Sequence, residues 1–313
     1  MTYSEIWHRI ATSYDDGEAR AIARILIEEL FGLSYADIVC GATEQLSADD
    51  TLRLDTAVRR IEQGEPLQHV LGYADFCGNR FSVNGSVLIP RPETEWLVDE
   101  GAKLMNGCIA SDETQHKAPH SPKRILDIGT GSGCIAISLK LRLGDAYVEA
   151  WDISEEALRT AQDNADALKA EVVFRKRDAL RADNTAAPWD LIVSNPPYIC
   201  DSERSAMDDN VLLHEPHTAL FVPDDDPLRF YRAIARYALL TLNIGGNLLF
   251  ECNTRYAEAT GKMLSDMGFK EVTVSDDCFN LPRFVRGSSP SQSTAPPNPP
   301  RRGGLSYPRL RKA

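Results

Sequence analysis

The sequence predicts an α/β fold in which helices cover a parallel sheet, preceded by a small helical bundle and a β-hairpin connector. From residue 124 onward, short apolar runs alternate with helical patterns, as in sheets built by right-handed crossovers. Residues 1–65 instead repeat apolar side chains at helical spacing. A chain of 313 residues is long enough to form two domains, and its content of 43% apolar residues suffices for a sizeable core.

The first two segments are expected to be the bundle and the connector. In residues 1–65, Ser47 is a plausible helix start, and glycines at positions 17, 32 and 64 mark likely helix ends. A bundle this small more often presents a face to a partner than carries chemistry. Within residues 66–95, short strands are predicted at 67–73, 79–83 and 87–89 around Asn84-Gly85, a dipeptide typical of hairpin turns. A helix should begin within residues 90–95, because proline and acidic residues favour a first turn.

Residues 96–287 are expected to form the larger domain, which contains the parallel sheet. Its predicted strands are 125–128, 147–151, 172–174, 191–194, 247–251 and 271–274, and its clearest helices are 134–141, 154–169 and 228–242. Residues 107–123 are predicted to be a loop. Residues 288–313 are rich in Ser, Pro and Gly with basic residues, which predicts a disordered tail.

The charge distribution disfavours nucleic acid as a partner. The net charge is −12, but residues 288–313 contain five basic and no acidic side chains, which leaves −17 on the remainder (29 basic against 46 acidic). A body this acidic repels a phosphate backbone unless a local patch reverses the field. A protein or small-molecule partner is therefore favoured.

Cysteine and histidine spacing indicates neither a disulfide framework nor a metal site. The seven cysteines are scattered and never form a C-x-x-C pair, which fits reduced thiols in the cytoplasm. His116 and His120 lack ligand partners at suitable spacing, so no metal is expected. We interpret His214 and His217 as loop packing. The first thirty residues show no signal peptide, and no run reaches the roughly 18 apolar residues of a membrane span.

A glycine loop follows the first predicted strand of the sheet. It comprises Gly129, Thr130, Gly131, Ser132 and Gly133, with Asp127 ending the strand before it. Glycines let the backbone approach a ligand closely, although dinucleotide-binding folds use similar turns. A carboxylate at Asp127 suits an ammonium group better than a pyrophosphate. The loop therefore favours S-adenosylmethionine, whose methionine part carries an ammonium, over NAD.

Two further acidic residues complete the predicted nucleoside site. Asp152, with Ile153 beside it, ends the second strand about twenty residues after the glycine loop, where an acid accepts ribose hydroxyls. The alternative is that Asp152 or Ser154 only caps the following helix. Asp178, followed by Ala179, is placed to meet the adenine amino group, and a solvated turn explains it nearly as well.

The tetrapeptide Asn195-Pro196-Pro197-Tyr198 follows the buried strand at 191–194, at the edge where open α/β sheets bind ligands. Its prolines donate no N–H and hold the preceding residues extended, so the carbonyl oxygens of Asn195 and Pro196 can face a pocket. The Asn195 side-chain oxygen is a further acceptor, and Tyr198 supplies a flat face. Converging acceptors beside an aromatic ring suit a planar –NH2 group. A proline-rich turn that merely caps the strand is the alternative.

These motifs, in this order, resemble the class I S-adenosylmethionine-dependent methyltransferases, which have a Rossmann-like fold. The match narrows to the peptide chain release factor glutamine methyltransferase family (PrmC/HemK). Members methylate the side-chain amide nitrogen (N5) of the glutamine in the Gly-Gly-Gln motif of class I release factors, which supports translation termination. The resemblance covers about residues 1–287, and the segments that carry it are 89–95, 194–199, 215–220 and 283–287.

The resemblance implies roles for these residues. Asn195 and the Pro196 carbonyl would bind the two amide hydrogens of the substrate glutamine, while Pro197 borders the site and Tyr198 packs on the amide plane. Asn195 would also border the cofactor, which leaves as S-adenosylhomocysteine. Arg91 would contact substrate or anchor the hairpin. Residues 1–65 would recognise the release factor, and we expect a cytoplasmic monomer without membrane association.

Three other interpretations remain to be weighed. An adenine-N6 DNA or RNA methyltransferase uses the same tetrapeptide, but it needs a basic groove, which the acidic body does not favour. A non-catalytic module that binds the cofactor and a partner is disfavoured by the intact Asn195 and Asp127. An NAD dehydrogenase is the most distant alternative. One departure from the family is that relatives often carry an aromatic residue against adenine where this chain has Asp178-Ala179.

Overall fold

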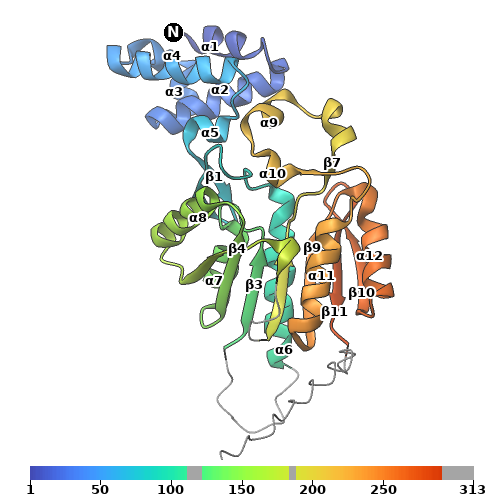
Figure 1. Ribbon diagram of the computed structural model, residues 1–313. Coiled ribbons are helices and arrows are strands. Elements are labelled where there is room, and N and C mark those ends of the chain that lie inside the picture. Colours follow the sequence, from blue (N-terminus) through green and yellow to red (C-terminus); the bar gives the residue numbers. More distant parts are fainter. Residues whose placement is uncertain (111–121, 183–187, 291–313) are drawn as a thin grey trace, which may run out of the picture.

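The computed structural model describes residues 1–110, 122–182 and 188–290. Figure 1 shows a central sheet with helices on both faces and a helical bundle at one end. The sheet has seven strands in the order β10-β11-β9-β6-β3-β4-β5. They are β3 (Arg124–Ile128), β4 (Tyr147–Asp152), β5 (Val172–Lys176), β6 (Trp189–Ser194), β9 (Leu242–Glu251), β10 (Lys270–Asp276) and β11 (Pro282–Ser288). All six strands predicted for this sheet are confirmed.

The strand order fixes where a ligand can bind. β11 is antiparallel to both its neighbours, and the other neighbouring strands run parallel. The chain builds outward from β3 through β4 to β5, and then returns to place β6 and β9 on the other side of β3. The carboxyl ends of β3 and β6 therefore form the topological switch point, which is the usual ligand site of such sheets.

Two hydrophobic clusters hold the helices against the sheet. On one face lie α6 (Glu95–Ala110), α7 (Cys134–Leu143) and α8 (Glu155–Leu168), and on the other lie α11 (Arg229–Thr241) and α12 (Ala257–Asp266). Successive strand residues alternate between the clusters, so Ile125 belongs to the first and Leu126 to the second. Strands buried on both faces explain the near-continuous apolar runs in the sequence.

The amino-terminal bundle has its own apolar core. It consists of α1 (Tyr3–Ile10), α2 (Asp16–Phe31), α3 (Tyr35–Val39) and α4 (Ala48–Glu62), with a 3-10 turn at Ala42–Gln45. The predicted start at Ser47 is confirmed, since its hydroxyl accepts the Asp50 N–H at 3.1 Å. Gly32 caps α2 in a left-handed conformation. The predicted helix end at Gly17 is wrong, because Asp15 caps α2 and places Gly17 in its first turn.

The connector contains a hairpin, but its turn is not the predicted one. The predicted strand at 67–73 is wrong, because Leu67–Leu71 is helix α5, and residues 87–89 are not a strand either. The hairpin pairs β1 (Tyr73–Phe76) with β2 (Asn79–Ser82), which confirms the predicted strand at 79–83. Cys77 and Gly78 both have positive φ values, as a tight hairpin turn requires. Asn84 is held elsewhere, because its Nδ2 donates to Thr160 Oγ1 of α8 at 3.0 Å. A tertiary contact thus overrides the local preference of Asn84-Gly85.

The remaining elements lie mainly around the carboxyl ends of the strands. They are the 3-10 turns Pro92–Thr94, Ala179–Arg181, Asp201–Ala206 and Thr254–Tyr256, the helices α9 (Asp209–His214) and α10 (His217–Leu220), and the short strands β7 (Ile199–Cys200) and β8 (Phe221–Val222). Helix α6 continues to Ala110, past the start of the predicted loop at 107. The rest of that loop up to residue 121, with His116 and His120, lies outside the described residues.

The carboxyl-terminal end also differs from expectation. The segment 283–287 is part of strand β11, which the periodicity did not predict, and Ser288 still belongs to it. The predicted tail lies outside the described residues from 291 onward. The six cysteines whose side chains are described are free thiols. In the described ranges, no helix is long and apolar enough to span a membrane, and no cluster of three potential ligands is placed to hold a metal.

Gly133, at the junction of β3 and α7, allows a close helix contact. Its φ is +82°, and an added Cβ would lie 2.9 Å from Ile137 Cδ1 and 3.1 Å from Ala161 Cβ. We expect Gly133→Ala to destabilise the fold by about 2–4 kcal/mol, from backbone strain plus overpacking. Gly72→Ala is the matched control, because Gly72 has φ +84° with nothing within 4 Å of the added Cβ. Denaturant unfolding measures both, and equal losses would contradict the packing argument.

Candidate active site

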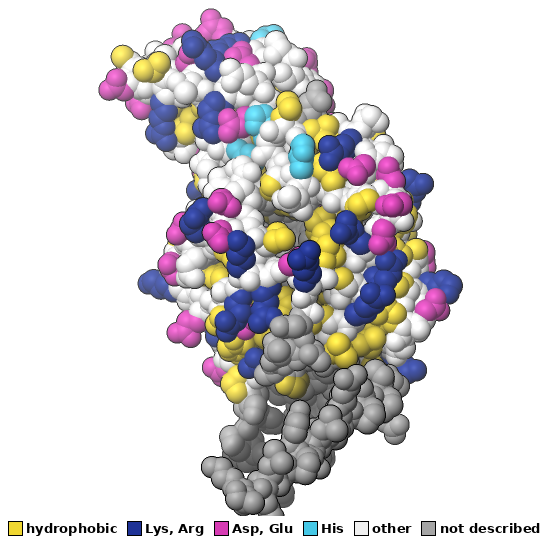
Figure 2. Space-filling model, in the orientation of Figure 1, with side chains coloured by type: hydrophobic (Ala, Val, Ile, Leu, Met, Phe, Trp, Pro, Cys, Tyr) yellow, Lys and Arg dark blue, Asp and Glu magenta, His cyan; other side chains and the backbone are white. Residues whose placement is uncertain are grey.

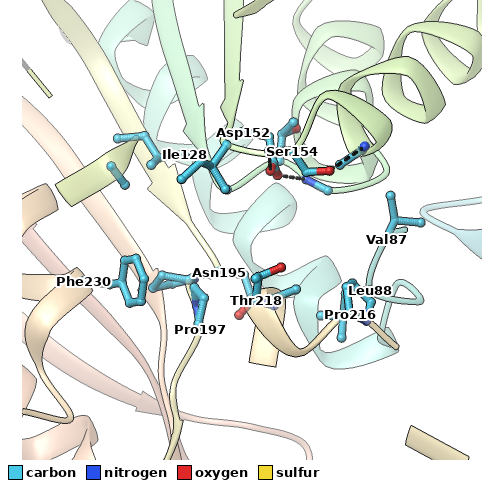
Figure 3. A pocket seen from close by; sticks show the side chains of 18 of the residues that line it. Val87, Leu88, Ile128, Asp152, Ser154, Asn195, Pro197, Pro216, Thr218 and Phe230 are labelled. Atoms are coloured by element: carbon cyan, nitrogen blue, oxygen red, sulfur yellow. Dashed lines mark hydrogen bonds between the residues drawn. The ribbon is translucent and has the colours of Figure 1, made fainter. Parts of the chain in front are cut away.

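A cavity of about 370 Å³ lies at the carboxyl ends of β3, β4 and β6, at the switch point of the sheet. This volume is typical of small-molecule sites. In Figure 3, Asp152 and Ser154 lie on one wall, and Asn195, Pro197 and Phe230 lie on the opposite wall. Most of the predicted cofactor residues and the first three residues of the tetrapeptide therefore border one cavity, whereas Asp127, Gly133 and Tyr198 do not line it.

The glycine loop turns the chain from β3 into α7 beside this cavity. Gly129, Gly131 and Gly133 have φ values of 78°, 54° and 82°, which other residues rarely adopt. The N–H groups of Gly129 and Thr130 donate to the Trp151 carbonyl oxygen at 2.8 and 2.9 Å, which fastens the loop to β4. Gly133 is buried at the N-cap of α7. The residues that border the cavity are Gly129, Thr130, Gly131 and Ser132.

Asp127 lies beneath the loop and is fully buried. Thr130, which borders the cavity, donates its hydroxyl to Asp127 Oδ2 at 2.6 Å. Among the described residues, Asp127 Oδ1 has no hydrogen-bond partner. Burial raises the pKa of Asp127 to about 7, and the Thr130 hydroxyl and the nearby Ala136 N–H only partly oppose this. A buried, incompletely paired carboxylate next to a cavity favours a cationic ligand group nearby.

Asp152 both shapes the loop and borders the cavity. Its Oδ2 accepts the Gly131 N–H and its Oδ1 accepts the Ser154 N–H, each at 2.9 Å. Burial raises the pKa of Asp152, and these N–H groups oppose the rise. Ser154 caps α8, since its hydroxyl accepts the Ala157 N–H at 3.1 Å. Each Asp152 oxygen keeps a further lone pair, so the structural contacts and a ribose contact are compatible.

The far end of the cavity combines a polar turn with apolar walls. Asp178 Oδ1 accepts the Leu180 N–H at 2.9 Å, as in the turn that the sequence left as an alternative, and Asp178 still borders the cavity. Ile153, which is 56% exposed, and Ala179 border it as well. Phe230, in the first turn of α11, provides an aromatic wall. An aromatic surface is therefore present although Ala179 does not supply one.

The tetrapeptide is fastened at both ends. Before it, the Ser194 hydroxyl donates to the Ile128 carbonyl oxygen at 2.6 Å and joins β6 to β3. At its end, the Tyr198 N–H donates to the Leu220 carbonyl oxygen at 3.2 Å. Within the described chain, no hydrogen bond reaches the carbonyl oxygens of Asn195 or Pro196, or Asn195 Oδ1. The acceptors that the sequence singled out are thus left available to a ligand.

A buried carboxylate supports the tetrapeptide from behind. The Tyr198 hydroxyl donates to Glu251 Oε1 at 3.3 Å, and Asn195 Nδ2 donates to Thr94 Oγ1 at 3.4 Å. Burial raises the pKa of Tyr198, so its hydroxyl stays protonated. Burial also raises the pKa of Glu251, while the Thr94 hydroxyl and the Arg283 guanidinium oppose the rise. The tetrapeptide is therefore held by side chains from distant segments.

Arg91 is tied to the segment that follows the tetrapeptide. Its Nη2 lies 2.5 Å from Glu215 Oε1, and Glu215 Oε2 accepts the Ile89 N–H at 3.2 Å. Arg91 also borders the cavity, so both predicted roles, substrate contact and anchoring, remain compatible with its position. His217, the first residue of α10, donates its Nε2–H to the Leu212 carbonyl oxygen at 2.9 Å. Figure 2 shows histidine side chains gathered where the bundle meets the catalytic domain.

Sequence reasoning missed several residues of the cavity. Val87 and Leu88 close one end together with Thr218, and Phe230 lines another wall. Thr218 lies in a segment that the sequence had already matched to the family, which was an available signal. For Phe230 the signal was topological: a helix that precedes a parallel strand begins at the edge where the preceding strands end. That edge is where the cavity lies.

The residues present fit S-adenosylmethionine. The incompletely paired Asp127 carboxylate, the glycine loop with its close backbone approach, and Asp152 at the end of β4 would bind a ligand that carries an ammonium and a ribose. Ile153, Ala179 and Phe230 would flank a planar base.

Comparison with known proteins relates both domains to one family. The family described as "PrmC N-terminal domain" matches residues 8–72, and "Methyltransferase small domain" matches residues 95–220. The release factor glutamine methyltransferase of Bacteroides thetaiotaomicron is 43% identical, covering 87% of this chain and 93% of that protein. That of Flavobacterium psychrophilum is 36% identical (88% and 94%), and that of Neisseria gonorrhoeae 35% (85% and 92%).

Solved structures are less similar. The hMettl16 catalytic domain in complex with MAT2A 3'UTR hairpin 6 is 17% identical, covers 79% of this chain and 84% of that chain, and has a TM-score of 0.48. The Thermus thermophilus 16S rRNA N2 G1207 methyltransferase, in complex with AdoMet and guanosine, is 15% identical (69% and 49%) with a TM-score of 0.44. Similarities this low have no bearing on activity. The sequence identity to these relatives, over most of both chains, shows that the chain belongs to the release factor glutamine methyltransferase family.

Proposed function

We propose that this protein transfers a methyl group from S-adenosylmethionine to the side-chain amide nitrogen, N5, of the glutamine in the Gly-Gly-Gln motif of class I release factors. The observation that carries the proposal is the position of Asn195 and Pro196. Their unbonded acceptor oxygens lie beside a cavity that also contains the cofactor-type residues Asp152 and Gly131. The family of the chain supplies the substrate class.

The proposed chemistry relies on orientation. S-adenosylmethionine supplies an electrophilic methyl group on a sulfonium, which is also the leaving group. An amide nitrogen is a poor nucleophile, because its lone pair is delocalised into the carbonyl. Asn195 Oδ1 and the Pro196 carbonyl oxygen would accept the two amide hydrogens, which fixes the amide plane and returns electron density to nitrogen. They would also stabilise positive charge on that nitrogen, while Tyr198 packs against the amide plane.

The proposed cofactor site follows from the residues around the cavity. Asp127 would favour the ammonium of the methionine part, Asp152 would accept the ribose hydroxyls, and Asp178 would meet the adenine amino group. Asp178 is the weakest of these assignments in physical terms, since its carboxylate already closes a turn. Ile153 and Phe230 would lie against the base.

The partner and domain assignments belong to the same proposal. We expect the bundle, residues 1–65, to recognise the release factor, the connector 66–95 to carry Arg91 to the site, and residues 96–287 to perform catalysis in a cytoplasmic monomer. Nucleic acid is less favoured as a substrate. On the face in Figure 2, Lys and Arg side chains lie in separate groups among acidic and apolar ones, without one continuous basic tract.

One assay distinguishes the proposed function from its alternatives. Labelled S-adenosylmethionine is offered with a purified class I release factor, with the same factor carrying a replaced Gly-Gly-Gln glutamine, and with duplex DNA. We expect label on the intact factor alone. Label on DNA would favour the adenine-N6 methyltransferase, and cofactor binding without any transfer would favour a non-catalytic module.

Asn195→Ala should lower kcat by about 100-fold or more, because it removes an oriented acceptor that acts on the reacting amide. The dissociation constant for S-adenosylmethionine should stay within about threefold, since the methionine, ribose and base contacts come from other residues. Steady-state kinetics and calorimetry measure the two quantities. Near-normal turnover of the release factor would contradict the acceptor role.

The buried Asp127 should make the ligand-free protein less stable as pH rises. Its pKa is about 7 in the fold, above the usual 3.8, so its contribution to stability is present below pH 4 and lost as pH rises through 7. Asp127→Asn removes this loss. The melting temperature of the variant relative to the wild type should therefore increase as the pH is raised from 5 to 8. The same variant should bind S-adenosylmethionine poorly.

The exposed Asp145 offers a matched control for that experiment. Asp145→Asn should leave the difference in melting temperature from the wild type constant across the same pH range. If Asp127→Asn also shows a constant difference, the buried carboxyl does not titrate in this range.

A further inference from the structure

Glu251, at the end of β9, is a buried carboxylate with two protein hydroxyls bound to it. It is 1% exposed. Thr94 donates its hydroxyl to Oε2 at 2.6 Å, and Tyr198 donates its hydroxyl to Oε1 at 3.3 Å. Burial raises the pKa of Glu251, whereas Arg283 Nη1, 3.9 Å from Oε1, favours the charged, acceptor-only form of the carboxyl group. In that ionised form, both hydroxyls point their protons at Glu251.

This arrangement sets the direction of the next hydrogen bond. Thr94 is 3% exposed, and its hydroxyl has a single proton, which Glu251 takes. Thr94 Oγ1 can then only accept from Asn195, which must present its amino group, as the 3.4 Å contact from Nδ2 shows. The reversed carboxamide would place Oδ1 against an oxygen without a free proton and leave a buried acceptor pair unsatisfied.

We propose that Thr94 and Glu251 are positioning residues that hold the Asn195 carboxamide in the one orientation that leaves Oδ1 for the acceptor amide. This inference rests on the proposed function, because the group that would use Oδ1 at that place is the –NH2 of the proposed glutamine substrate. The side-chain amino group in the same place would repel the substrate –NH2. The relay Glu251–Thr94–Asn195 thus prevents an orientation that is sterically equal and chemically unproductive.

The same carboxylate also fixes the other end of the tetrapeptide. Tyr198 donates to Oε1 while Thr94 donates to Oε2, so one side chain orients the acceptor residue and the aromatic residue together. Thr94 is the last residue of the 3-10 turn Pro92–Thr94, which directly follows Arg91, and it borders the cavity. The segment before α6 therefore contributes to the site through Asn195 as well as through Arg91.

A double-mutant cycle tests whether Thr94 acts through Asn195. Thr94→Val keeps the shape of the side chain and removes its hydroxyl. In the wild-type background it should lower kcat about tenfold while the dissociation constant for S-adenosylmethionine stays within about threefold. In the Asn195→Ala background it should lower the residual single-turnover rate by less than about twofold, because the group it orients is gone. Thr94→Ser should keep at least about a third of wild-type kcat.

Thr241→Val is the matched control, since Thr241 is equally buried and its hydroxyl donates to the Tyr237 carbonyl oxygen within α11. It should leave kcat unchanged. If Thr94→Val does not fold, as judged by its melting temperature, Thr94→Ala replaces it in the cycle. If the residual rate of Asn195→Ala is too low to measure, the cycle is run on the dissociation constant of the release factor with S-adenosylhomocysteine bound.

The outcomes separate this inference from the proposed function. Equal fold-losses in both backgrounds, an unaffected kcat in Thr94→Val, or failure of Thr94→Ser to restore kcat would each overturn the relay. Wild-type transfer to the release factor in the same assays would leave the proposed function intact in those cases. Absence of wild-type transfer to the intact factor would instead remove the proposed function, and the relay with it.

Discussion

The site depends on the need of buried carboxylates for hydrogen-bond donors. A charged group without water is costly unless donors surround it, so each buried acid dictates the arrangement of its neighbours. Glu251 accepts hydrogen bonds from the hydroxyls of Thr94 and Tyr198, and Asp127 accepts one from the hydroxyl of Thr130. In each case the donor belongs to a segment that borders the cavity. The interior charges of the sheet therefore determine the shape of the surface on which chemistry takes place.

The parts of the site that follow from local chemistry were predictable. The conformations of the glycine loop and of the diproline, each of which follows a buried strand, are determined by a few neighbouring residues. The parallel order of the strands then brings both segments to one edge of the sheet. Asn84-Gly85 shows the limit of local reasoning, because its hairpin preference is overridden by a contact with Thr160 in another helix. Strand β11 was missed because its antiparallel pairing is not expressed in any periodicity of its own residues.

The unpredicted part of the site lies in contacts between distant segments. Phe230 reaches the cavity only because α11 begins at the edge where the other strands end. Thr94 reaches Glu251 across 157 residues of sequence, and Arg91 reaches Glu215 across 124. Arg91, Thr94 and Glu215 lie in segments that resembled the family, yet their positions in the sequence could not predict which partner each would contact. Strand order decided that.

The contact between Thr94 and Glu251 has a consequence for the synthesis of this protein. The residues of the glycine loop and the tetrapeptide leave the ribosome well before β9. Arg283, which opposes the burial-driven rise in the pKa of Glu251, leaves later still. A nascent chain can thus assemble the first strands of the sheet without an oriented Asn195. Domains generally fold as units from the amino-terminal end. Catalytic competence therefore requires β9 and β11 as well as the earlier strands that carry the glycine loop and the tetrapeptide.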